Sequence, residues 1–105
     1  MSECCVIITT YANEKTGRKI IDSLLRRKLA ACIQTQRISS YYHWKGKVNN
    51  EDEYMAVIKT LKVLYKDVEK DILANHDYET PEIIELPVTD GSEGYLNWIR
   101  TECNR

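Results

Sequence analysis

The densest group of side chains able to do chemistry lies in one segment, His76–Glu82 (HDYETPE). It combines an imidazole, three carboxylates and a phenol, which are groups that move protons or bind cations. The segment lies between a helical pattern and the apolar pair Ile83–Ile84, so we expect a loop. Loops held by a rigid scaffold often carry function. The alternative interpretation is a polar connector whose side chains cap the preceding helix.

His76 is the candidate metal ligand of this loop, and its alternative role is to contact the last carbonyls of the helix before it. Glu79 and Glu82 are the nearest oxygen donors, although Glu82 could instead pair with Lys59. Glu53 and Lys59 are six residues apart on one predicted strand, so they share a face and could form a charge cluster with the loop. A transition-metal site takes three or four ligands. One His among carboxylates is therefore weak evidence for such a site, and the cofactor to test for is a divalent cation, Cu²⁺ or Zn²⁺.

Apolar spacing predicts the elements that position this loop. The order is β-α-β-β-α-β followed by a final helix, which is the ferredoxin-like α+β arrangement in a single domain, residues 1–105. The predicted strands are 4–10, 32–44, 53–60 and 83–88, and the predicted helices are 13–28, 61–72 and 95–99.

The long hairpin formed by 32–44 and 53–60 is unusual. Its first strand has 13 residues and spans about 40 Å at ~3.3 Å per residue, whereas most strands have about 5–6 residues. Either a bulge breaks it, or it runs past the edge of the domain and pairs with another chain. Tyr41 and Trp44 lie on it, and with Tyr78 they predict the wall of a pocket between subunits; interface packing is the alternative. The chain has seven Tyr, two Trp and no Phe, which also favours an oligomer.

Composition excludes several classes of protein. The net charge of -1 argues against a nucleic-acid binder, and no apolar run is long enough for a membrane span. The N-terminus has no signal-peptide pattern, and four cysteines without a C-x-x-C pair are typical of reduced thiols, so we expect a cytoplasmic protein. The chain has no Ser/His/Asp-type order, phosphate-cradling glycine loop or metal-hydrolase motif, so we expect no enzyme activity.

Four blocks, in this order, resemble the CutA-type divalent-cation tolerance proteins and span nearly the whole chain. They are Leu29–Cys32, then Ser40 and Tyr41 with Trp44–Lys47, then Glu53 with Ile58–Thr60, and finally His76–Glu82 with Leu86–Val88 and Tyr95–Ile99.

The resemblance implies a ferredoxin-like homotrimer, similar in assembly to PII-type signalling proteins, whose hairpins extend across neighbouring subunits. It implies a non-enzymatic response to divalent metal ions such as copper, with the metal or a small ligand bound in clefts between subunits. Animal members of the family are linked to anchoring of acetylcholinesterase, so the alternative function is a scaffold that binds a protein partner. The cleft-lining residues would be Tyr41, Trp44, Lys59, Tyr78, Glu79 and Glu82, with His76 as the metal ligand.

The loop departs from the family pattern. Asp77 follows the histidine where the family usually has Pro, so the backbone is less constrained and the loop gains a carboxylate. In some bacterial members of the family, copper binding is assigned to a Cys near the end of the first strand and to two successive His before the loop. The matching positions here are Thr9, Asn75 and His76, of which only His76 keeps a ligand of that set.

Overall fold

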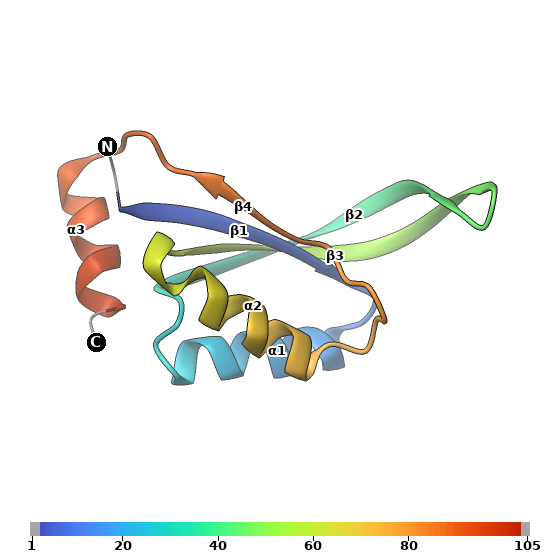
Figure 1. The fold of residues 1–105 in the computed structure, drawn as a ribbon, viewed down its shortest axis with the longest axis horizontal. Coiled ribbons are helices and arrows are strands. Elements are labelled where there is room, and N and C mark those ends of the chain that lie inside the picture. The colour runs from blue at the N-terminus through green and yellow to red at the C-terminus, as the bar shows by residue number, and fades with distance from the viewer. Residues whose placement is uncertain (1–2, 104–105) are drawn as a thin grey trace.

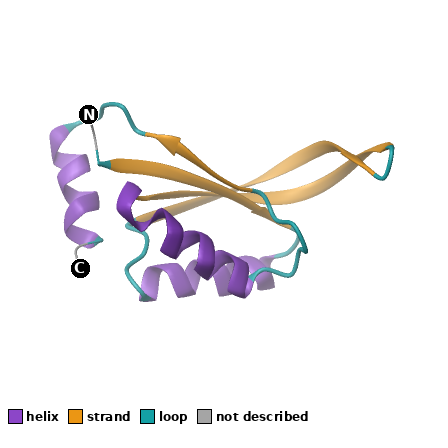
Figure 2. Cartoon of the chain, in the orientation of Figure 1, coloured by secondary structure: helices purple, strands orange, loops and turns teal. Residues whose placement is uncertain are grey.

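The computed structural model describes residues 3–103, which form four strands and three α-helices joined by short loops (Figure 2). The order confirms the predicted α+β succession, but the strand predicted at 53–60 begins earlier, at Lys47. The elements are β1 Cys4–Tyr11, α1 Glu14–Arg26, β2 Cys32–Trp44, β3 Lys47–Leu61, a 3₁₀ turn Lys62–Leu64, α2 Tyr65–Asn75, β4 Ile83–Pro87 and α3 Glu93–Glu102.

The strands form one antiparallel sheet in the order β2-β3-β1-β4, and α1 and α2 cover one of its faces (Figure 1). Alternate residues of a strand point to opposite faces. On the helix side, Ile7 pairs in register with Ile58, and both pack in the core with Ile20, Leu24 and Ile72 from the helices. These five side chains are completely buried. The helical spacing seen in the sequence therefore marks the residues that hold the helices on the sheet.

Polar side chains fix the two helices at defined points. The side chain of Asn13 accepts a hydrogen bond from the backbone N–H of Thr16 at 2.9 Å and so caps the start of α1. Between the helices, the buried carboxylate of Asp71 accepts hydrogen bonds from the Ser23 hydroxyl at 3.0 Å and from the Arg27 guanidinium. This network ties α2 to the C-terminal half of α1.

The helix α3 packs over one end of the other face of the sheet, where Leu96 and Ile99 form a small second core with Cys4. The guanidinium of Arg100 donates to the Glu3 carboxylate at 2.6 Å, and both ends of the described chain, residues 3–103, lie at this end of the molecule (Figure 1). Within residues 3–103, no further element covers the remainder of this face, and Ile84 and Leu86 of β4 are 46% and 45% exposed there.

β2 and β3 continue beyond the sheet as a two-stranded arm, residues 38–53, and the molecule measures 44 × 25 × 21 Å. The pairing between the strands runs unbroken from Cys32–Lys59 to Trp44–Lys47, whereas β1 ends opposite Tyr54. Lys45 and Gly46 close the hairpin with φ of 52° and 77°, the positive values that a two-residue I′ turn requires. Of the two predicted outcomes, the arm therefore runs past the edge of the domain without a bulge.

Candidate functional site

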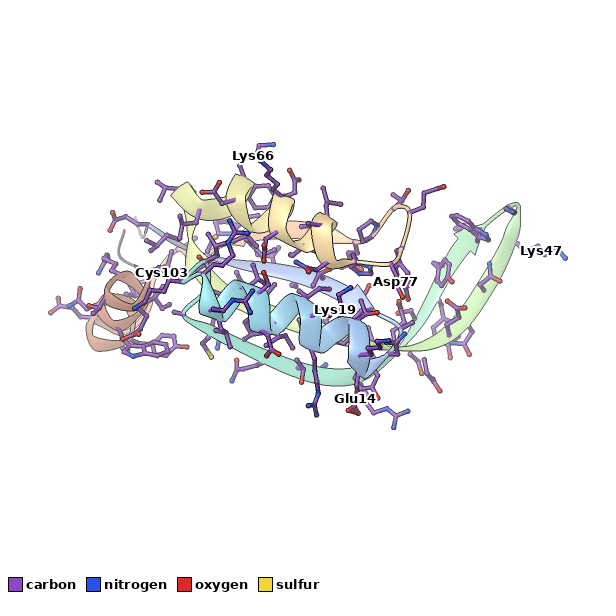
Figure 3. The ribbon with its side chains drawn as sticks, turned by 90° about the horizontal axis from the view of Figure 1, so that it is seen from below. Glu14, Lys19, Lys47, Lys66, Asp77 and Cys103 are labelled. Atoms are coloured by element: carbon purple, nitrogen blue, oxygen red, sulfur yellow. The ribbon has the colours of Figure 1, made fainter. Side chains whose placement is uncertain are left out.

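A cleft of about 680 Å³ opens where the arm leaves the sheet, beside the loop that follows α2. Figure 3 shows Lys47 at the tip of the arm and Asp77 on the loop near its base. The end of β1 contributes Thr10, so three separate parts of the chain meet here. The cleft is lined by Thr10, Ser40, Tyr41, Tyr42, Trp44, Glu51, Glu53, Asp77, Tyr78, Glu79, Thr80 and Glu82.

His76 fastens the loop to the sheet. Its side chain is completely buried; Nε2 lies 2.8 Å from the Thr10 carbonyl, and Nδ1 lies 3.0 Å from the backbone N of Tyr78. A carbonyl only accepts and a backbone N–H only donates, so Nε2 carries the proton and Nδ1 the lone pair. Nδ1 therefore has no proton to donate to the neighbouring Asp77 carboxylate, which lies 3.5 Å away. Both ring nitrogens are engaged, so this arrangement gives His76 a positioning role and leaves no lone pair for a metal ion.

Glu53 and Tyr78 join the arm to the loop. The Tyr78 hydroxyl donates to Glu53 Oε2 at 2.7 Å, and Glu53 is only 8% exposed. Burial, the hydrogen bond to Glu53 and nearby carboxylate charges all raise the pKa of Tyr78 well above its usual value. The phenol therefore stays protonated at neutral pH and acts as a fixed donor. The expected association of Glu53 with the loop is present through this bond.

The other carboxylates lie nearer to solvent. Glu79 and Glu82 are exposed at the rim of the cleft, and the Asp77 carboxylate accepts a hydrogen bond from the Thr16 hydroxyl at 3.1 Å. On the arm, Glu51 accepts from the Tyr42 hydroxyl, and this bond raises the pKa of Tyr42. Among residues 3–103, no Lys or Arg lines the cleft. The charged side chains of this lining are therefore all acidic.

Lys59 does not reach this cleft. It lies on the same face of β3 as Glu53, as expected, but six residues of strand separate the two by about 20 Å. Its ammonium group contacts the side-chain oxygen of Gln34 and lies 5.6 Å from the centre of the Tyr95 ring. The predicted pairing with Glu82 is also not among the ion pairs of residues 3–103. The prediction that Glu53 and Lys59 share a face of the strand is confirmed. Their separation along the strand, however, keeps Lys59 away from the loop.

Within residues 3–103, no three His, Cys, Asp or Glu side chains lie close enough together to hold a metal ion.

The structure brings together five of the predicted lining residues and adds others that sequence reasoning missed. Thr10 and Glu51 join the cleft through strand register, and Ser40 faces Glu51 across the hairpin. The predicted lining residues that the cleft contains are Tyr41, Trp44, Tyr78, Glu79 and Glu82.

Comparison with known proteins gives consistent matches over almost the whole chain. The chloroplastic CutA protein of Arabidopsis thaliana is 40% identical over 96 residues, which are 90% of this chain and 53% of the relative. The CutA divalent-cation tolerance protein of Pyrococcus horikoshii is 30% identical over 100 residues, which are 95% of this chain and 98% of the relative. The chain thus spans about half the length of the plant relative and nearly all of the archaeal one.

Solved structures agree with this assignment. CutA from Xylella fastidiosa superimposes with a TM-score of 0.94 at 32% identity, covering 98% of this chain and 100% of that one. The periplasmic divalent cation tolerance protein CutA from Archaeoglobus fulgidus gives a TM-score of 0.93 at 30% identity, covering 96% and 99%. No helix within residues 3–103 is long and apolar enough to cross a membrane. Residues 5–102 match the family described as CutA1 divalent ion tolerance protein, and the chain therefore belongs to that family.

Proposed function

We propose that the chain assembles as a PII-like homotrimer of single ferredoxin-like domains, in which each arm crosses onto a neighbouring subunit. The strand order β2-β3-β1-β4 supports the ferredoxin-like topology. On the arm, Tyr41 is 73% exposed, Trp44 54% and Val48 67%, although burying each would contribute about 1.5–3 kcal/mol. The uncovered sheet face around Ile84 and Leu86 adds a second apolar area. A neighbouring subunit on these areas would remove both from water.

The function that the cleft supports best is non-enzymatic binding of a divalent cation, as part of a response to metal ions. The observation that carries this proposal is the set of five carboxylates around the cleft, which no Lys or Arg of the described part of the chain joins. Asp and Glu oxygens are among the ligands that Zn²⁺ takes in proteins. The rim pair Glu79 and Glu82 would hold a hydrated Cu²⁺ or Zn²⁺ ion, with further ligands from a neighbouring subunit. The four cysteines of the sequence form no C-x-x-C pair, which supports a reducing, cytoplasmic location.

Calorimetric titration with Cu²⁺ and Zn²⁺ tests the binding, and light scattering tests the assembly. We expect heat of binding for the unmodified protein, a large loss in a Glu79→Gln, Glu82→Gln double variant, and no change in Glu102→Gln, which alters an exposed carboxylate of α3. The expected mass is about 37 kDa, three times 12.3 kDa. Equal heats in all three proteins would remove the rim as the site, and a mass near 12.3 kDa would refute the trimer.

A scaffold that binds a protein partner is the second candidate, favoured by the surface of α3. Tyr95 and Trp98 are 40% and 41% exposed, and their ring centres lie 5.6 Å apart. Exposed Tyr and Trp side chains are frequent anchors of protein interfaces. A partner captured by this surface should be lost in Tyr95→Ser, Trp98→Ser and retained in the Glu79→Gln, Glu82→Gln variant. Loss in the second variant alone would place the partner at the cleft instead.

A further inference from the structure

A second pocket, of about 260 Å³, lies on the helix side of the sheet, between α1 and the strands β1, β2 and β3. Within residues 3–103 it shares no lining residue with the cleft, so it is a separate site. The trimer proposed above buries the arm and the opposite face of the sheet, and it does not use this pocket. Drug-sized ligands occupy pockets of about 300–1,000 Å³, so this volume suits a somewhat smaller molecule.

Tyr11 forms the floor of this pocket. It is 3% exposed, its ring stacks on Tyr54 with centres 5.6 Å apart, and Gly17 makes room for it, since a Cβ there would overlap the ring. Among residues 3–103, the Tyr11 hydroxyl makes no hydrogen bond. The fully enclosed side-chain atoms without a partner in this part of the chain are Thr9 Oγ1 and Asp71 Oδ2. The Tyr11 hydroxyl is not one of them, so it opens on the pocket, where a ligand can reach it.

The polar groups around this hydroxyl favour a ligand that accepts hydrogen bonds. Burial, followed by the neighbouring Tyr54 and Glu14 groups, raises the pKa of Tyr11, so the phenol keeps its proton at neutral pH and can donate it. The Arg18 guanidinium and the Thr35 hydroxyl line the same pocket. A guanidinium combined with hydroxyl donors is suited to a carboxylate. One end of the ligand is therefore an oxyanion.

Glu14 and Arg18 supply one charge of each sign at the exposed edge of the pocket (Figure 3 shows Glu14 at the start of α1). They are four residues apart on the helix, a spacing at which Glu and Arg can pair, yet no ion pair of residues 3–103 joins them. The Glu14 carboxylate instead accepts from the Tyr54 hydroxyl at 3.5 Å. Its charge disfavours a doubly charged phosphate and offers an acceptor for an ammonium group. Ile21 and the ring of Tyr54 add an apolar wall.

We propose that this pocket binds a small α-amino acid with an apolar side chain. The carboxylate of the ligand accepts from the Tyr11 hydroxyl and the Arg18 guanidinium, and its ammonium group donates to Glu14. Its side chain lies against Ile21 and the ring of Tyr54. A zwitterion matches both charges at the edge of the pocket, whereas an anion or a cation alone matches only one.

Titration of the ¹⁵N-labelled protein with L-leucine, followed through amide chemical shifts, tests this proposal. Two analogues of similar size are the controls: L-leucinamide lacks the carboxylate, and 4-methylpentanoate lacks the ammonium group. We expect saturable shifts with L-leucine, largest in residues 11–18 and around Thr35. Either analogue should bind at least about tenfold more weakly, because each loses one charge-assisted hydrogen bond.

Four variants assign the contacts. Tyr11→Phe removes the hydroxyl but keeps the stacked ring, and it should weaken L-leucine binding about tenfold. Arg18→Gln should remove the preference for L-leucine over L-leucinamide, and Glu14→Gln should remove the preference over 4-methylpentanoate. Both residues are exposed, so these two variants test the site even if Tyr11→Phe does not fold. Arg26→Gln changes an exposed residue of the last turn of α1, outside the pocket, and should have no effect.

Absence of saturable L-leucine binding, or equal binding of all three compounds, would overturn the proposal. Tighter binding of 4-methylpentanoate than of L-leucine would show a site for a simple carboxylate and refute the amino acid. Unchanged affinity in both Tyr11→Phe and Arg18→Gln would place the ligand elsewhere. The outcome is independent of the metal titrations, because Glu79 and Glu82 line the other cavity.

Discussion

Replacing Tyr78 by Phe removes the one hydroxyl that joins the loop to the arm. The ring keeps its place beside the His76 ring, whose centre lies 4.7 Å away, so the change is limited to the bond with Glu53. The decrease in the free energy of unfolding therefore measures what this 2.7 Å hydrogen bond contributes when its acceptor, Glu53, is only 8% exposed. The variant also leaves the second oxygen of that carboxylate without a protein donor.

The magnitude follows from the charge and burial of Glu53. Hydrogen bonds to charged groups contribute about 1.5–3 kcal/mol, and a buried group that loses its partner bears most of its desolvation cost. The cleft admits water, which can replace part of the bond, so we expect a loss of about 1.5–2 kcal/mol. For a domain near 100 residues this lowers the melting temperature by roughly 6–15 °C.

Urea denaturation measures the loss, at one fixed protomer concentration because subunit association contributes to apparent stability. Tyr42→Phe is the matched control: it removes the same kind of bond, to Glu51, but on the exposed arm. We expect a cost of at most about 0.5 kcal/mol there, since water replaces an exposed partner readily. A double-mutant cycle of Tyr78→Phe with Glu53→Gln should show a coupling of about 1 kcal/mol or more.

Equal losses in Tyr78→Phe and Tyr42→Phe would refute this reasoning, because burial of Glu53 would then add nothing to the bond. A coupling near zero in the cycle would show that the loss arises elsewhere, for example in packing of the ring.

Three further predictions concern other parts of the chain. His76→Ala deprives two backbone groups of their partners and should cost about 2–3 kcal/mol, and amide exchange in residues 77–82 should become faster; unchanged exchange would contradict its positioning role. Gly17→Ala would place a Cβ 2.3 Å from the Tyr11 ring and should destabilise by about 1–3 kcal/mol; Gly94→Ala, with nothing within 4 Å on a helix, should not destabilise in the same urea experiment. Burial, aided by a nearby carboxylate, raises the pKa of Cys5 to about 12, so the folded state keeps a proton that the unfolded state releases above about pH 8.5. Stability should therefore fall from there to pH 12 by up to about 1.4 kcal/mol per pH unit more in the unmodified protein than in Cys5→Ala, and parallel pH profiles would contradict this.

The regular elements could be predicted because their residues bury one face. The spacing of Ile20 and Leu24 marks α1, and the apolar run at the start of the chain marks β1. The early start of β3 could not be predicted in this way, because Lys47–Asp52 is almost entirely polar and lies on an arm exposed on both faces. Backbone pairing across a tight turn, rather than burial, makes this segment a strand.

The candidate site could be predicted in part, for similar reasons. The loop and Tyr78 stood out through their chemical groups, and the periodicity of strands placed Glu53 on the correct face. Thr10 and Glu51 could be found only from the register that pairs the strands, which residue types alone do not reveal. Lys59 was predicted to line the cleft but does not. Strand periodicity gives the face on which a residue lies, but it does not show which residues of other segments lie beside it.

The ion pair between Glu3 and Arg100 determines where a label attached to the chain would lie. It holds both ends of the described chain beside α3, at the end of the molecule opposite the arm (Figure 1). An affinity tag or fluorophore attached at either end would therefore begin away from the cleft.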